Sequence, residues 1–223
     1  MITDDPGTPG NGKWENNLAI TFSHVPGEWS VDTPLFDLNY GWGDHIQLTL
    51  QGPVTVLKRS GHGAIAGLGG TEAALKWRFL DEEICGVDMS MFPRILFHVL
   101  RSSVQRGLAD DGTRFQIPFQ LEKKIGWLDL DMEFGPVIST AGQSEFLSGV
   151  VVGKELNKTT SIMAEVHATS RTNLSNDVVT LNVGWRHQLA PHAVWIASLG
   201  HEVHRGADEP LALIGYCGVQ LLY

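Results

Sequence analysis

The dominant pattern along this chain is a strict alternation of apolar and polar residues. Between positions 14 and 23, Leu18 and Ile20 lie on one face, and Asn17 and Thr21 lie on the other. A period of two is typical of a β-strand, and helical spacing is scarce throughout. About twelve such segments are present, each close to the ~9 to 11 residues that a tilted strand needs to cross a bilayer. They cover approximately residues 14–23, 31–40, 44–56, 71–80, 87–98, 113–122, 127–135, 145–154, 160–169, 178–187, 193–202 and 211–223.

In nearly every segment one face is apolar and the other carries charged or polar groups. Leu128 and Leu130, for example, alternate with Asp129 and Asp131. A sheet that closes on itself needs two such faces, one for its interior and one for its surroundings. The segment 145–154 is rich in Gly and Val, and its pattern does not indicate which face is inside.

Alternation alone does not decide which face of a barrel is inside, since a soluble lipocalin-like calyx would turn the apolar face inward. Three features favour a membrane barrel with the apolar face outward. The strand number exceeds what inward side chains can fill, and charged residues make up only 18% of the chain, against ~25% in soluble proteins. Aromatic residues also gather near strand ends, where membrane interfaces lie. They are Trp14, Tyr40, Trp42, Trp77, Trp127, Trp185 and Tyr223.

These patterns predict an all-β fold, a closed, up-and-down, antiparallel transmembrane β-barrel that forms a single domain over residues 1–223. The tight connections follow the even-numbered segments, as in Gly41–Asp44, whereas longer ones follow the odd-numbered segments. Because outer-membrane barrels have short periplasmic turns, we expect residues 1–12 to be an N-terminal periplasmic segment. The longer connections are 24–30, 57–70, 99–111, 136–144, 170–177 and 203–209.

Composition limits the partners of the chain. The net charge of -9 and the lack of a Lys/Arg-rich run argue against a nucleic-acid partner. Residues 1–12 lack the basic start and apolar stretch of a signal peptide, so the chain is interpreted as the mature form of a protein of the bacterial outer membrane. Its expected partners are outer-membrane lipids, an unidentified small-molecule solute and the outer-membrane assembly machinery. The alternation that ends at Tyr223 resembles the C-terminal assembly signal of bacterial outer-membrane proteins. Cys85 and Cys217 are expected to be unpaired.

The candidate site is a lumen that contains both signs of charge. Asp129, Asp131 and Glu133 share one strand face, and three neighbouring carboxylates persist only with water or cations nearby. The sequence permits two interpretations, a cation-biased passage or a plug of internal salt bridges. Four basic residues are expected on the same inner surface, giving a basic wall beside the acidic one: Lys76, Arg78, Arg94 and Arg114.

No motif indicates catalysis, a metal or a cofactor. The chain has nine histidines, but His201 and His204 flank no HExxH motif. Gly61–Gly70 lacks the Lys-Ser/Thr ending of a phosphate loop and is predicted to be a flexible outer loop. A barrel of this size could be an outer-membrane lipase, but that activity needs a Ser–His pair that the apolar face lacks. The chain is therefore expected not to be an enzyme.

Several blocks resemble one family of uncharacterised outer-membrane proteins. This family is filed under the meta-pathway of phenol degradation, and its members are often labelled transporters. The resemblance implies a β-barrel and an outer-membrane location, and it supplies no functional residues. The matching blocks include Thr3–Pro6, Thr8–Gly10, Asp37–Gly41, Gly67–Thr71, Leu75–Glu82, Asp111–Thr113, Gly149–Val152 and the closing hairpin His192–Tyr223.

The leading functional hypothesis is an outer-membrane barrel that passes small solutes, with aromatic or hydrophobic ones among the candidates, by facilitated diffusion. The alternative is a non-conducting structural barrel. A lipase-like enzyme and a soluble lipocalin-like binder are less favoured.

Overall fold

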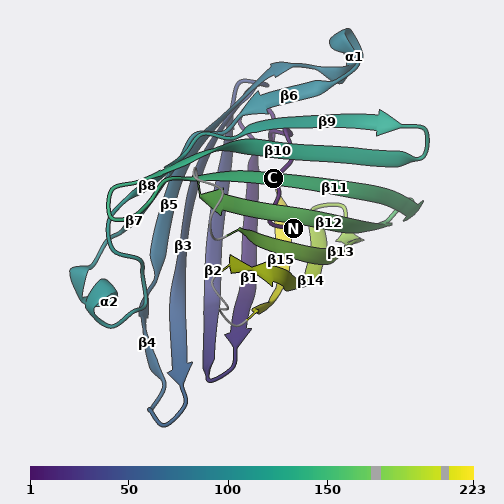
Figure 1. Cartoon of the computed structure of the whole chain (residues 1–223). Helices are drawn as coiled ribbons and strands as arrows, with labels where there is room; N and C mark the ends of the chain where they lie inside the picture. Colours follow the sequence, from purple (N-terminus) through teal and green to yellow (C-terminus); the bar gives the residue numbers. More distant parts are fainter. Residues whose placement is uncertain (172–176, 207–210) are drawn as a thin grey trace.

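The computed structural model describes residues 1–171, 177–206 and 211–223, and its strands wrap around one central space (Figure 1). The described part contains fifteen strand segments and two short helices, α1 (Glu82–Cys85) and α2 (Arg101–Gln105). The strands are β1 (Trp14–Val25), β2 (Glu28–Trp42), β3 (Ile46–Arg59), β4 (Ile65–Leu68), β5 (Gly70–Leu80), β6 (Asp88–Met91), β7 (Arg94–His98), β8 (Arg114–Gln116), β9 (Phe119–Ile125), β10 (Leu128–Ser139), β11 (Glu145–Asn157), β12 (Thr160–Arg171), β13 (Val178–Ala190), β14 (Ala193–Arg205) and β15 (Leu213–Leu222).

The sheet closes on itself because the first and last strands pair. β1 and β15 are antiparallel, with Glu15 opposite Leu222 and His24 opposite Leu213. Three barrel strands are each built from two consecutive segments, β4 with β5, β6 with β7 and β8 with β9, so the fifteen described segments form twelve barrel strands. The predicted closed, up-and-down, antiparallel barrel is confirmed, and the predicted segments coincide closely with these strands.

Prolines interrupt two of the barrel strands that were predicted to be continuous. β6 ends before Pro93, and β8 ends before Pro118, because a proline has no N–H to donate to a strand ladder. The two interruptions lie side by side, since the Phe92 N–H donates to the Pro118 carbonyl at 2.9 Å. Gly135 lets β10 lie close to the second interruption, because a Cβ there would lie 2.4 Å from the carbonyl oxygen of Ile117.

The prediction of a flexible loop over Gly61–Gly70 is wrong in part. Ile65–Leu68 forms β4 and pairs with β3, so the connection is a hairpin with a short turn. The segment lacks a long alternating pattern, which is why the sequence did not indicate a strand. Two of the predicted longer connections, 170–177 and 203–209, lie partly outside the described residues, which leave out 172–176 and 207–210.

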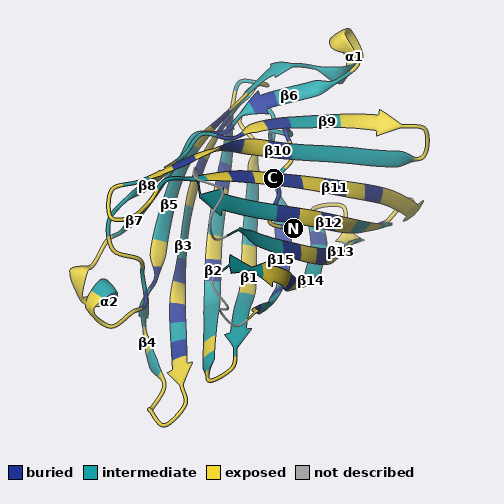
Figure 2. Ribbon diagram, viewed as in Figure 1, coloured by how far each residue is buried: buried dark blue, intermediate teal, exposed yellow. Residues whose placement is uncertain are grey.

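The apolar face of the strands is outside, as expected for a membrane barrel. Buried and exposed positions alternate along the strands (Figure 2). The large apolar side chains Leu18, Leu50 and Leu181 are exposed on the outer face, whereas Lys76 and Gln120 are fully buried inside. The apolar calyx is therefore excluded as the arrangement of this sheet, because its interior would carry the apolar side chains.

β11 now has an orientation, which the sequence pattern did not provide. Leu147 and Val151 are buried inside, whereas Phe146, Val150 and Val152 are exposed outside. The side chains that β11 turns toward the lumen are therefore apolar, unlike the charged ones of β10.

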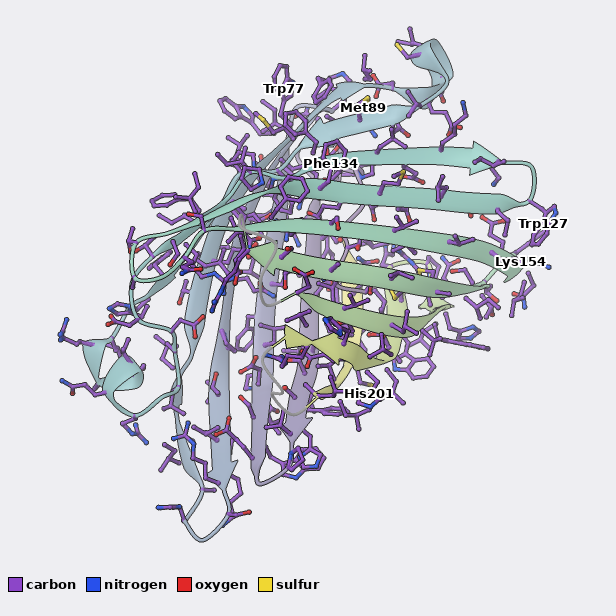
Figure 3. The ribbon with its side chains drawn as sticks, in the orientation of Figure 1. Trp77, Met89, Trp127, Phe134, Lys154 and His201 are labelled. Atoms are coloured by element: carbon purple, nitrogen blue, oxygen red, sulfur yellow. The ribbon has the colours of Figure 1, made fainter. Side chains whose placement is uncertain are left out.

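Aromatic residues mark the end of the barrel that has the tight turns. Trp14 and Tyr40 pack with ring centroids 4.9 Å apart, and the backbone of Trp14 pairs with that of Tyr223. Lys154 lies over the Trp127 ring at 4.3 Å beside the turn between β9 and β10 (Figure 3). This ring of amphipathic side chains is typical of a membrane interface. No helix in the described part of the chain is long and apolar enough to cross a membrane.

Candidate functional site

The first eight residues, here called the N-terminal strap, lie inside the barrel. The backbone N–H groups of Ile2 and Thr3 both donate to the Glu165 carboxylate of β12, and the Ile2 contacts are 3.0 Å long. At the other end of the strap, the Thr8 hydroxyl donates to the Asp44 carbonyl at 2.7 Å, in the turn between β2 and β3. The strap therefore runs from the end with the tight turns into the middle of the lumen.

The barrel wall has glycines where the N-terminal segment lies against it. A Cβ at Gly149 of β11 would lie 1.8 Å from the Thr3 hydroxyl oxygen, and one at Gly41 of β2 would lie 1.9 Å from the Gly10 carbonyl oxygen. Contacts this short are not possible, so a side chain at either position would push the segment away. The wall is thus shaped to receive residues 1–12, which the sequence predicted only to be a periplasmic segment.

Asp4 of the strap joins the two basic residues of the predicted basic wall that lie deepest in the lumen. Its Oδ2 lies 3.2 Å from the Lys76 Nζ and 3.8 Å from the Arg94 Nη2. The Lys76 Nζ also donates to the Asp5 carbonyl at 2.6 Å. The Lys76 side chain is 2% exposed, whereas that of Asp4 is 38% exposed, so Asp4 lies between Lys76 and the open lumen.

Glu133 of β10 completes this cluster from the barrel wall. Its carboxylate accepts from Arg94, from the Gln120 amide at 3.2 Å and from the Asp4 N–H at 3.3 Å. The Phe92 ring lies close to both bases, with its centroid 4.7 Å from the Lys76 Nζ and 4.3 Å from the Arg94 Cζ. Two positive and two negative side chains are therefore held together on an aromatic ring.

The charge state of Asp4 follows from its neighbours. Burial alone would raise the pKa of the Asp4 carboxyl, but the positive charges of Lys76 and Arg94 hold that pKa below its ordinary value. Asp4 precedes the first strand and is ionised at neutral pH. The strap is consequently held in the lumen by a charge interaction in addition to its backbone hydrogen bonds.

The remaining predicted site residues lie away from this cluster. Asp129 lies 3.7 Å from Lys124 near the turn between β9 and β10, and Asp131 lines a cavity inside the barrel that is described below. Arg78 lies 3.0 Å from Asp81 at the end with the tight turns. At the opposite end, Arg114 lies 3.5 Å from Asp110 and 3.6 Å from Glu145. The structure thus joins Lys76, Arg94 and Glu133 and separates the other four.

A cavity of about 590 Å³ remains inside the barrel beside the strap. Its wall includes polar residues of β2 and β3, among which the Gln47 amide and the Thr49 hydroxyl donate to the Asn39 side-chain oxygen. Several acidic residues also face the cavity, and none has a basic group within ion-pair distance in the part of the chain that the structure describes. These are Glu15, Asp37, Glu72 and Asp131.

Three residues of this site were not predicted from the sequence. Asp4 lies in a segment without alternation, so no pattern placed it in the lumen. Phe92 lies between β6 and β7, where the sequence predicted one continuous strand, so the pattern did not indicate its position beside the two bases. Glu165, in contrast, alternates with Ala164 and Val166 on a predicted strand and could have been assigned to the inner face. Among the described residues, no group of three or more His, Cys, Asp or Glu side chains could hold a metal ion.

Known proteins match this chain by structure and not by sequence. Neither a protein family nor a curated protein matches the sequence. The NanC porin structure matches with a TM-score of 0.67 and 9% identity, over 92% of this chain and 98% of that one. The KdgM porin in complex with disordered oligogalacturonate matches with a TM-score of 0.62 and 10% identity over the same shares of the two chains, 92% and 98%.

A third match is the translocator domain of the autotransporter NalP from Neisseria meningitidis. It has a TM-score of 0.62 and 10% identity, over 99% of this chain and 90% of that one. Similarity at this level of identity shows the fold and does not extend to the solute. The resemblance to proteins filed under phenol degradation stays a prediction. The chain has the fold of outer-membrane porins and translocator barrels.

Proposed function

We propose that the protein is an outer-membrane channel through which small solutes cross passively, and that the N-terminal strap narrows its lumen. The observation that carries this proposal is the polar cavity of about 590 Å³ inside a closed barrel whose outer face is apolar. An interior built only for stability would be filled by its own side chains, as in small barrels. The porin titles of two structural neighbours, NanC and KdgM, agree with the proposal.

Removing the strap should increase the conductance of the channel several-fold. In planar bilayers we expect a small conductance for the full chain and a larger one for a variant that lacks residues 2–8, because the strap occupies part of the lumen. Heat-modifiable gel migration should confirm that the shortened barrel is folded. Two folded barrels that both pass no current would contradict the proposal.

The second candidate function is a non-conducting structural barrel, and the strap is the observation that favours it. Asp4, Lys76, Arg94 and Glu133 form a compact network that could serve to fill the lumen. This candidate gains support if the variant without residues 2–8 is unstable and passes no current.

The acidic residues that face the cavity should make the current cation-biased. Asp131 has no basic partner within ion-pair distance among the described residues, so Asp131→Asn should lower cation preference while leaving thermal stability nearly unchanged. The reversal potential in a salt gradient measures this effect. It should shrink as ionic strength rises, because exposed charges are screened within ~8 to 10 Å at physiological salt.

Asp129→Asn is the matched control for this measurement. Asp129 is on the same strand face, but it lies beside Lys124 at the barrel end and does not line the cavity. A larger change in selectivity for Asp129→Asn than for Asp131→Asn would place the selective region at the barrel end and contradict the proposal.

A further inference from the structure

The cluster at the centre of the lumen accepts a defined number of negative charges. Lys76 and Arg94 are balanced by Glu133, which belongs to the wall, and by Asp4, which belongs to the strap. Among the described residues, Asp4 is the only acidic side chain within ion-pair distance of Lys76. If the strap left the lumen, the Lys76 ammonium would lose this counter-charge and would face the lumen directly. A solute anion could then take the place of Asp4.

We infer that Lys76 and Arg94 form a binding site for one carboxylate group, which Asp4 fills in the structure and which a small solute with a single carboxylate can fill instead. The site itself is independent of channel activity. Its use by a permeating solute rests on the proposed function.

The geometry of the cluster is that of a carboxylate site. One oxygen of Asp4 lies within ion-pair distance of both bases, 3.2 Å from the Lys76 ammonium and 3.8 Å from the Arg94 guanidinium. The Phe92 ring packs against both bases and fixes their positions. The Arg94 Nε–H is buried and has no acceptor among the described residues, so the guanidinium group has one unused donor.

Charge counting selects solutes with one negative charge. Without Asp4, the two bases and Glu133 leave a net charge of one positive unit, which one carboxylate neutralises. A second carboxylate on the same solute would meet Glu72 and Asp131, which face the same cavity. The solute is therefore a monocarboxylate whose remaining part is neutral or positively charged. Such a solute is compatible with a lumen that otherwise prefers cations.

Acetate binding to the purified barrel in detergent tests this inference. In Asp4→Asn the strap loses the charge that holds it on the two bases, so it no longer competes strongly with a free carboxylate. Isothermal titration calorimetry should therefore show acetate binding at least about tenfold tighter than to the unmodified chain, because an attached competitor has a high effective concentration. Sodium chloride at equal ionic strength should give no comparable binding. Asp5→Asn is the matched control, because the Asp5 carboxylate accepts from the Gly7 N–H and contacts neither base.

A double variant, D4N/K76Q, separates the site from indirect effects. It removes one charge of each sign and should fold, but it should lose the acetate binding gained in D4N. Equal acetate affinity for D4N and the unmodified chain, equal binding of chloride and acetate by D4N, or acetate binding retained in D4N/K76Q would each overturn the inference. Acetate binding by D4N without current in any bilayer would instead refute the channel and leave the site standing.

Discussion

Replacing Glu133 with alanine should lower the free energy of unfolding by about 3 to 5 kcal/mol, the usual cost of removing one partner from a buried ion pair. The Glu133 side chain is 2% exposed and that of Arg94 is 13% exposed, so water cannot replace the lost carboxylate. The Gln120 amide and the Asp4 N–H would lose an acceptor in the same step. Asp4 lies 3.8 Å from Arg94 and compensates only in part. Reversible urea unfolding in lipid vesicles measures the difference.

The matched control is Asp129→Ala, on the same face of the same strand. Asp129 and Lys124 are 31% and 54% exposed, and pairs of this kind contribute only about 0 to 1 kcal/mol. The two substitutions remove the same charge, so a difference between them reports burial and contacts. Similar costs for Asp129→Ala and Glu133→Ala would show that the central cluster is not the buried network described above.

The barrel itself could be predicted because alternation is a local property of the sequence. Successive side chains of a strand point to opposite faces, so Leu50 faces outward where Thr49 and Gln51 face inward. Predicting this does not require the position of any distant strand. The two proline interruptions also had a visible signal, since Pro93 and Pro118 lie within predicted strands and proline rarely occupies a continuous strand.

The arrangement of charges in the lumen could not be predicted in the same way. Alternation indicates the face of a residue, whereas its height in the barrel depends on the register of every strand pair. Lys76 and Arg114 were both predicted on the inner surface, and in the structure they line two different cavities. They nevertheless take part in different clusters, because Lys76 lies beside Asp4 and Arg114 lies beside Asp110 and Glu145 at one end.

The strap was outside the reach of the pattern for a different reason. Asp4 and Lys76 are 72 positions apart, and Thr3 and Glu165 are 162 apart, so their contacts exist only once the barrel has closed. Residues 1–12 form no strand and have no periodicity, so the sequence predicted only a periplasmic segment. Gly41 was predicted in a tight turn and Gly149 in a strand, and neither position indicated that the N-terminal segment lies against it.

An arginine on the outer face should lower the free energy of unfolding far more than one on the inner face of the same strand. Leu50 of β3 is 53% exposed on the outer face and lies away from the strand end, where Ile46 pairs with Trp77. In lipid, Leu50→Arg should lower the free energy of unfolding by about 2 to 4 kcal/mol, the cost of an arginine on the lipid face near the bilayer midplane.

Gln51→Arg is the matched control, because Gln51 is the next residue and lines the polar cavity. The cavity has room for a longer side chain, and Glu72, which is opposite Gln51 in the β3–β5 register, supplies a negative charge nearby. The cost of Gln51→Arg should therefore be well below that of Leu50→Arg when both are measured by reversible unfolding in the same vesicles. Equal costs would show that the outer face does not contact lipid. In that case the membrane location would be wrong, while the barrel topology would stand.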